Sequence, residues 1–265
     1  MEGLLVRELK GWEEMEKVVD LQRQVWGRAE SDLVPRGLLI AVQDQGGLVA
    51  GAFLGEEMVG FVFGFPTQDP GLQHSHMLGV LEAYRGRGAA LLLKRFQRDW
   101  CLARGIRKVV WTFDPLRGAN ANFNLRKLGA FSRTYLPDHY GPMSGINAGA
   151  PSDRFLAEWD LLSPRVYTRI YAPPPETEVA GLPQANRVEG EVPLEARLDL
   201  EAGRVLVQIP EDWGRILRED PALAQRWREH SRLVFGRYFA RGYVAVDFLR
   251  GPNRYVLAKD GDLDR

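Results

Sequence analysis

The chain has 265 residues, of which 45% are hydrophobic, and its 35 Lys and Arg residues balance 35 Asp and Glu residues. This length can bury a sizeable core in one large domain or two small ones, while a net charge of zero excludes a global attraction to nucleic acid or to an anionic membrane. The single cysteine, Cys101, excludes an intrachain disulfide and a cysteine-based metal site.

The first 162 residues predict alternating strands and helices. Apolar spacing and glycine stops predict helices at 11–27, 35–45, 88–104 and 120–129. Strands are predicted at 4–9, in a hairpin at 48–66, and at 74–81, 108–113, 130–136 and 154–161. In helix 88–104 the spacing places Lys94 on the solvent face, opposite Leu93 and Trp100. The strand, glycine turn, helix and strand of 74–113 form a β-α-β unit, so part of the sheet is expected to be parallel.

The rest of the chain divides at a proline-rich stretch. Residues 163–193 hold six of the 16 prolines and predict an extended connector, into which 166–171 lead as a strand. Residues 194–265 predict strands at 204–209, 243–249 and 253–260, with a helix that starts at Asp220 and Pro221. The order helix, Ala-Arg-Gly, strand occurs at 101–113 and 238–248. It indicates either a degenerate partial repeat or the ordinary preference of a helix-to-strand corner for a basic residue and then glycine.

The segment YRGRGAA, residues 84–90, joins predicted strand 74–81 to helix 88–104, and we call it the glycine loop. The first-turn amides of a helix lack intrahelical partners, and the helix dipole adds partial positive charge there. Glycines let an anion approach the backbone, and Arg85 and Arg87 add charge. The loop therefore predicts either a structural turn or a pyrophosphate cradle. The dinucleotide pattern GxGxxG and the P-loop ending GK[ST] are both absent.

These residues resemble the acyl-CoA loop of the GCN5-related N-acetyltransferase (GNAT) superfamily, R/Q-x-x-G-x-G/A, commonly preceded by V-x-P-x-Y. The matching residues are Val80, Tyr84, Arg85, Gly86, Gly88 and Ala90, with Glu82 in place of Pro. The family's K-L-G-F motif is matched by Lys127, Leu128 and Gly129, with Ala130 in place of Phe. The resemblance covers about the first 160 residues, and the chain is also similar to an uncharacterised branch of predicted acetyltransferases.

The resemblance implies an α+β fold with a mixed, partly splayed sheet flanked by helices. The domains would be a GNAT-like acyl-CoA-binding domain at 1–162, the connector at 163–193, and a smaller C-terminal β-α-β extension at 194–265. It also implies acetyl-CoA as cosubstrate, with no metal. The backbone of Leu78 and Val80 would bind pantetheine. The amides of Arg85, Gly86, Arg87, Gly88, Ala89 and Ala90 would hold the pyrophosphate. Asn120 is a further pantetheine candidate, although counting back from K-L-G puts the family's usual Asn at Gly118.

The acid and the base are harder to assign, because Leu125 occupies the position where many family members have a catalytic Tyr. His76 is either a base or a packed, hydrogen-bonded histidine, and it is expected to share a strand face with His74. Asp114 is either a base or a turn-forming residue before Pro115. Tyr140 is either the missing acid or a packing residue. The segment 143–154 is either a surface loop or an acceptor-binding lid.

Three functions remain open. The first is an N-acyltransferase that moves an acyl group from acyl-CoA directly to a small-molecule amine. The second is an acyl-CoA-binding or sensing protein of the same fold without catalysis. The third is a nucleotide-binding module that uses the same loop. The N-terminal residues lack the apolar core of a signal peptide, and no uncharged apolar run approaches ~18 residues. We therefore expect a cytoplasmic protein, whose C-terminal part forms either a pocket wall or a homodimer contact.

Overall fold

The computed structural model describes residues 3–27, 30–145 and 148–259. It has two compact units, one comprising Met1–Trp111 with Ser144–Ile146 and the other Thr112–Met143 with Asn147–Arg265. The predicted domain boundaries at residues 162 and 193 stay a prediction. Over the described part of the chain, the search for a helix long and apolar enough to cross a membrane finds none.

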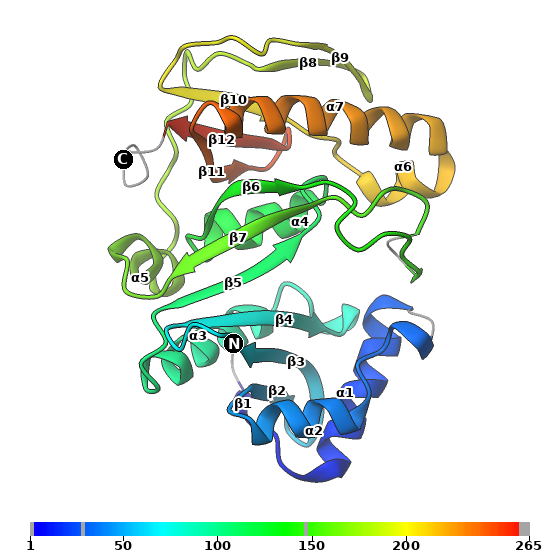
Figure 1. Ribbon diagram of the computed structural model, residues 1–265, viewed down its shortest axis with the longest axis vertical. Coiled ribbons are helices and arrows are strands. Elements are labelled where there is room, and N and C mark those ends of the chain that lie inside the picture. Colours follow the sequence, from blue (N-terminus) through cyan, green and yellow to red (C-terminus); the bar gives the residue numbers. More distant parts are fainter. Residues whose placement is uncertain (1–2, 28–29, 146–147, 260–265) are drawn as a thin grey trace. The chain divides into compact units, whose positions relative to one another are not determined.

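The first unit contains strands in the order β1-β2-β3-β4-β5 (Figure 1). Neighbouring strands pair antiparallel except β4 and β5, which are parallel, as the predicted β-α-β unit requires. The strands are β1 (Leu4–Glu8), β2 (Leu48–Leu54), β3 (Glu57–Pro66), β4 (Leu72–Val80) and β5 (Lys108–Phe113), which continues into the second unit. The helices are α1 (Gly11–Trp26), α2 (Arg36–Asp44) and α3 (Ala89–Leu102), with short 3-10 turns η1 (Glu30–Asp32) and η2 (Glu82–Tyr84).

An apolar cluster joins α1 and α2 to one face of these strands. Met15 and Val18 of α1 pack with Leu39 of α2 and with Phe61 and Phe63 of β3. The 3–4 residue spacing of the buried α1 positions forms the apolar stripe that such a helix needs to cover a sheet. Helix α3 contacts β1 to β4 and is bound to β4 through polar side chains, described below, on the opposite face.

A β-bulge interrupts β4. Ser75 pairs with Gly64 and Met77 pairs with the adjacent Phe63, so His76 is an extra residue between the two pairs. Residues opposite each other in a ladder share a face, and one inserted residue inverts the alternation beyond it. Met77 consequently joins the α1–α2 cluster instead of sharing the α3 side with Ser75, which the regular alternation of the sequence did not indicate.

The second unit contains strands in the order β7-β6-β11-β12-β10 and a separate two-stranded ladder, β8-β9. Its strands are β6 (Phe131–Leu136), β7 (Arg154–Asp160), β8 (Asn186–Glu189), β9 (Val192–Ala196), β10 (Arg204–Gln208), β11 (Tyr243–Leu249) and β12 (Arg254–Lys259). The pairs β6–β7, β6–β11, β11–β12 and β10–β12 are antiparallel. The predicted α+β class is therefore confirmed. The interpretation of the C-terminal part as a degenerate repeat stays a prediction. The strand orders of the two parts differ, because β12 lies between β10 and β11, while β4 and β5 are adjacent.

The helices of the second unit are α4 (Gly118–Ala121), α5 (Pro164–Tyr171), α6 (Trp213–Glu219) and α7 (Pro221–Ala240), and a π-helical turn, η3 (Asn122–Lys127), follows α4. Helix α7 begins as predicted, with the Asp220 carboxylate accepting a hydrogen bond from the Leu223 amide at 2.9 Å. The strand predicted at 166–171 is wrong, because this stretch is α5. Its Val166 and Ile170 are buried at helical spacing, and the tertiary contacts of this face override the β propensity of VYTRIY.

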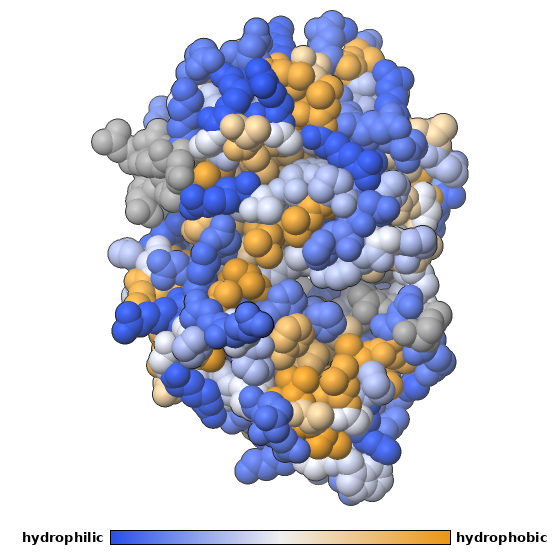
Figure 2. All heavy atoms as spheres, viewed as in Figure 1, coloured by the Kyte–Doolittle hydropathy of each residue, from blue (hydrophilic) through white to orange (hydrophobic). Residues whose placement is uncertain are grey.

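The surface is mostly polar on the face seen in Figure 2, with apolar side chains among the hydrophilic ones.

Sequence patterns did not predict β8 and β9, which lie within or next to the proline-rich stretch, nor the short helix α6. Each is held by non-local contacts. Examples are the Trp227 indole, which donates a hydrogen bond to the Glu191 carbonyl at 2.8 Å, and the buried Trp213 of α6, which bonds Asp114 at 3.0 Å.

Candidate functional site

The parallel strands β4 and β5 separate soon after they meet. Their register covers three pairs, from Leu72–Lys108 to His74–Val110, while β4 continues to Val80. The edge of β4 over 75–80 that would face β5 is therefore not part of this ladder. Backbone donors and acceptors along such an edge can bind an extended ligand arm that has amides of its own.

The glycine loop follows the end of β4 directly and leads into α3. Gly86 and Gly88 adopt φ angles of 76° and 93°, a left-handed conformation that favours glycine. A Cβ atom at Gly86 would meet nothing within 4 Å, so the backbone is open to an approaching group. No side chain caps the N-terminus of α3, which leaves its first amides for a ligand or solvent. These features fit a bound pyrophosphate.

The two arginines of the glycine loop differ in their contacts. Arg85 Nε donates a hydrogen bond to the Val80 carbonyl at 3.3 Å and so ties the loop to the end of β4. The Arg87 guanidinium lies 5.5 Å from the centre of the Tyr84 ring, and the Tyr84 hydroxyl donates a hydrogen bond to Glu57 of β3 at 2.6 Å. Both arginines are exposed. Their charge is therefore available to an anion in the loop, and the loop itself is braced against two strands.

The other predicted cofactor residues lie in different settings. Leu78 and Val80 pair with Val62 and Gly60 of β3 and so belong to the β4 segment beyond the bulge. Ala89 is buried and Ala90 half-buried in the first turn of α3.

Asn120 is exposed and lies within α4, so it is not the N-cap of this helix. At Gly118, the family's usual Asn position, a Cβ atom would lie only 2.5 Å from the Asn253 side-chain nitrogen. Close packing against the C-terminal residues therefore explains the glycine.

His76, the bulge residue, is exposed and belongs to an aromatic group on the α1–α2 side of β4. Its ring centre lies 5.6 Å from that of Phe65, 5.8 Å from that of Phe63 and 5.8 Å from that of His74. The expected shared face of His74 and His76 is thus observed. The imidazole is therefore accessible to solvent at the point where the strand is irregular.

A buried polar network lies between β4 and α3, and sequence patterns missed it. Lys94 Nζ donates hydrogen bonds to Ser75 Oγ at 3.1 Å and to Gln97 Oε1 at 2.9 Å, and it lies 3.9 Å from the centre of the Trp111 ring. Gln97 in turn donates to Gln73 at 2.7 Å. The prediction that Lys94 faces solvent is wrong, because its side chain is only 2% exposed. Burial lowers the pKa of Lys94 to about 7.

Asp114 is buried in the second unit and closely bound. Its carboxylate accepts hydrogen bonds from both terminal nitrogens of Arg228, at 2.9 and 3.0 Å, and from the Trp213 indole at 3.0 Å. It also accepts a hydrogen bond from the Leu116 amide at 3.0 Å, which is the turn geometry considered as its alternative role. The ion pair with Arg228 outweighs burial and holds the pKa of Asp114 below its usual value.

Tyr140 lies in the segment between β6 and β7, with 45% of its surface exposed. Its hydroxyl is 2.8 Å from Thr112 Oγ1, near the end of β5, and its ring lies against His139 and Arg154. Leu125, at the family's usual Tyr position, is fully buried. A hydroxyl is therefore present at the end of β5 even though the usual position holds none. Residues 146 and 147 of the predicted lid segment lie outside the described residues.

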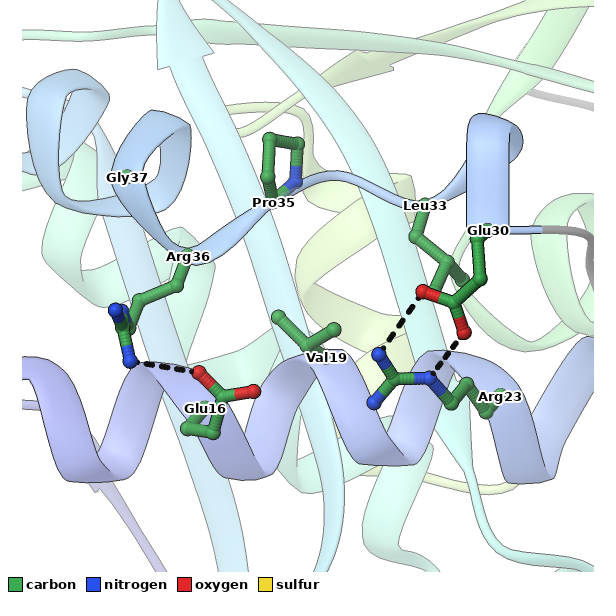
Figure 3. Close-up of a pocket in the computed structure, with 8 residues that line it drawn as sticks. All are labelled: Glu16, Val19, Arg23, Glu30, Leu33, Pro35, Arg36 and Gly37. Atoms are coloured by element: carbon green, nitrogen blue, oxygen red, sulfur yellow. Dashed lines mark hydrogen bonds and ion pairs between the residues drawn. The ribbon is translucent and has the colours of Figure 1, made fainter.

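A surface pocket of about 320 Å³ lies among α1, η1 and α2 (Figure 3). Its charged side chains bind one another, Arg36 with Glu16 at 2.9 Å and Arg23 with Glu30 at 2.8 Å. No predicted site residue lines it. Over the residues described here, no group of three or more His, Cys, Asp and Glu side chains could hold a metal ion.

Comparison with known proteins finds a family resemblance in the first part of the chain. The profile of the acetyltransferase (GNAT) family matches residues 12–130. This part of the chain is therefore similar to GNAT acetyltransferases. The match includes β4, the glycine loop, α3 and the Lys-Leu-Gly of residues 127–129. Tyr140 and the C-terminal strands lie beyond it. No curated protein sequence matches the chain significantly.

Solved structures resemble part of the chain. The ribosomal-protein-S18-alanine N-acetyltransferase from Escherichia coli superposes with a TM-score of 0.50 at 13% identity, over 60% of this chain and 94% of that one. An N-acetyltransferase from Staphylococcus aureus Mu50 gives 0.50 at 16% identity, over 60% and 98%. A GNAT family acetyltransferase from Elizabethkingia anophelis with acetyl-CoA bound gives 0.48 at 14%, over 60% and 99%. The first two likenesses show that the fold is shared.

Proposed function

We propose that the protein transfers an acetyl group from acetyl-CoA directly to an amino group of a small molecule. The observation that most supports this is the separation of β4 from β5 after His74, on a strand that runs into the glycine loop. The β4 edge and the first turn of α3 then form one continuous backbone surface. Its length and chemistry suit a pantetheine arm followed by a pyrophosphate.

The binding residues follow from this surface. The backbone of Leu78 and Val80 would bind the pantetheine amides, and Asn120 remains a further candidate. The amides of residues 85–90 would hold the pyrophosphate, with Arg85 and Arg87 adding charge. When bound, acetyl-CoA supplies the thioester. The acceptor nitrogen forms a bond to the acyl carbon as the carbon–sulfur bond breaks, the amine loses a proton, and the leaving thiolate gains one.

The proton steps are assigned by accessibility. His76 is exposed beside the gap and would take the proton of the amine. Tyr140, whose hydroxyl lies at the end of β5, would give a proton to the thiolate in place of the residue that Leu125 replaces. Asp114 is less suited to act as a base, because four hydrogen bonds occupy its carboxylate.

Thermal unfolding tests the binding surface. We expect acetyl-CoA and CoA to raise the melting temperature, and ATP and NAD to leave it unchanged. Gly88→Trp should abolish the rise, since the indole fills the cradle. Gly105→Trp is the matched control, because Gly105 is also a glycine of positive φ, 77°, at the other end of α3. Unchanged acetyl-CoA binding by a folded Gly88→Trp protein would remove the glycine loop from the proposal.

Thiol release in the presence of amines tests the transfer. We expect His76→Gln to lower turnover, with His74→Gln as the neighbouring control. The alternative function is acyl-CoA binding or sensing without catalysis, which Leu125 favours because a leucine cannot donate a proton. Tight acetyl-CoA binding without turnover against a broad panel of amines would support that alternative.

A further inference from the structure

Arg154, the first residue of β7, is a buried cation with weak partners. Only 6% of the residue's surface is exposed. One terminal nitrogen donates a hydrogen bond to the Asp153 carbonyl at 2.8 Å and the other to the Met143 sulfur at 2.7 Å. The guanidinium also lies 5.4 Å from the centre of the Tyr140 ring. Within the described parts of the chain, no carboxylate forms an ion pair with it.

Asp114, the carboxylate that most favours the charged form of Arg154, already binds other side chains. Asp114 favours the charged form of Arg154, but its two oxygens are bound by Arg228 and Trp213. Arg117 and Arg228 oppose that charged form of Arg154. Burial lowers the pKa of Arg154 further.

A structural role alone explains these contacts poorly. Removing a guanidinium from water costs free energy unless it is paired with an anion and fully hydrogen-bonded. A thioether is a weak acceptor, and an aromatic ring offers only a modest attraction to a cation. A carboxylate or phosphate would give the same nitrogens two charge-assisted hydrogen bonds. Met143 therefore occupies the position that an oxyanion would fill more favourably.

The position of Arg154 relates it to the proposed chemistry. Tyr140, which lies over the guanidinium, is the proposed acid, and its hydroxyl contacts Thr112 near the end of β5. Tyr140 is half-exposed and Met143 is partly exposed, so a small shift of these two side chains would open Arg154 to solvent. An acceptor held by Arg154 would lie within a side chain's length of that hydroxyl.

We propose that Arg154 binds an anionic group of the acceptor, so that the substrate is a small amine carrying a carboxylate or a phosphate. The inference rests on the proposed acyl transfer for its assignment of the ligand as the acceptor. The pairing of the anion with Arg154 is a separate claim that can fail separately. The carboxylate and the phosphate share the geometry that a guanidinium recognises, and the experiment distinguishes them.

Three small amines test the inference by thermal unfolding of the full-length, CoA-saturated protein. β-Alanine carries a carboxylate, O-phosphoethanolamine a phosphate, and ethanolamine neither. We expect at least one anionic amine to raise the melting temperature in a saturable way and ethanolamine to have no effect. Arg154→Met should weaken the binding of the anionic amine about 10- to 100-fold, which is the range for the loss of hydrogen bonds to a charged group. Arg154→Lys should restore part of the binding, since lysine keeps the positive charge but lacks the paired nitrogens of the guanidinium.

Controls separate the possible failures. Arg133→Met removes an exposed arginine of the neighbouring strand β6 and should change nothing. The CoA-induced rise should persist in Arg154→Met, which shows that this variant is folded. Three results would overturn the inference. The first is that ethanolamine stabilises the protein as much as the anionic amines do. The second is that an anionic amine binds Arg154→Met as tightly as it binds the wild type, and the third is that neither anionic amine changes the melting temperature. Loss of the CoA-induced rise in the wild type would instead overturn the proposed function.

Discussion

Replacing Lys94 by Met should change how the stability of the protein depends on pH. The Lys94 ammonium is removed from solvent between β4 and α3, and the hydrogen-bond acceptors shown for it, Ser75 and Gln97, are neutral. Burial lowers its pKa from 10.5 to about 7. Methionine has a similar length and no charge, so it fills the same space without the desolvation cost.

The sign follows from proton counting. Between pH 7 and pH 10, the unfolded chain keeps the Lys94 proton while the folded protein has lost it, so the free energy of unfolding rises with pH. Below the folded pKa both states are protonated, and the penalty for burying the charge is constant. From pH 6 to pH 9 the gain attributable to Lys94 is about 2 to 3 kcal/mol, since each unit of pKa difference corresponds to ~1.4 kcal/mol.

Urea denaturation at pH 6 and pH 9, followed by tryptophan fluorescence, measures this effect as the difference between the wild type and Lys94→Met. Lys17→Met, which removes an exposed lysine of α1, is the matched control. Cys101 does not interfere, because burial raises the pKa of its thiol to about 12 and it stays neutral over this range. An identical pH dependence in the wild type and Lys94→Met would refute the assignment of a buried, weakly basic lysine.

Three further substitutions test other contacts, each by urea denaturation. Asp114→Asn leaves Arg228 buried without its carboxylate and should cost about 3 kcal/mol or more; a near-neutral effect would show that the pair is not structural. Gly129→Ala should cost about 1 to 2 kcal/mol, because φ is 73° there and a Cβ would lie 3.2 Å from Val166 Cα; wild-type stability would contradict this geometry. Asp220→Ala removes the cap of α7 and should cost about 1 kcal/mol, with Asp220→Asn losing much less; equal losses would exclude capping.

Local signals allowed most of the first unit to be predicted from the sequence. Glycine stops, the hairpin at 48–66 and the β-α-β unit depend on neighbouring residues, and the glycine loop is recognisable because a short motif carries it. The cap of α7 is equally local.

Non-local contacts account for the failures. Arg169 of α5 binds Asp247, 78 residues away, at 3.1 Å, and this contact helps to hold a β-prone stretch in a helix. Lys94 is buried because Gln73 and Ser75 of another element meet α3, and Asp114 finds its partner 114 residues later in Arg228. The weak partners of Arg154 also come from tertiary structure, so residue type and spacing gave no sign of a site there.

The extra residue at position 76 has a consequence for engineering β4. Before this residue the odd-numbered side chains of β4, such as Ser75, face α3, and after it the odd-numbered side chains, such as Met77, face α1 and α2. Deleting His76 would remove the bulge but leave Ser75 opposite Gly64 and Met77 opposite Phe63, so Met77 and the later residues would keep their sides of the sheet. A straight ladder that kept residue 76 would instead shift every later residue by one position, and Leu78 and Val80 would exchange the α3 side for the α1–α2 side. The bulge is therefore what allows β4 to carry one residue more than the paired segment of β3 without turning its later side chains over.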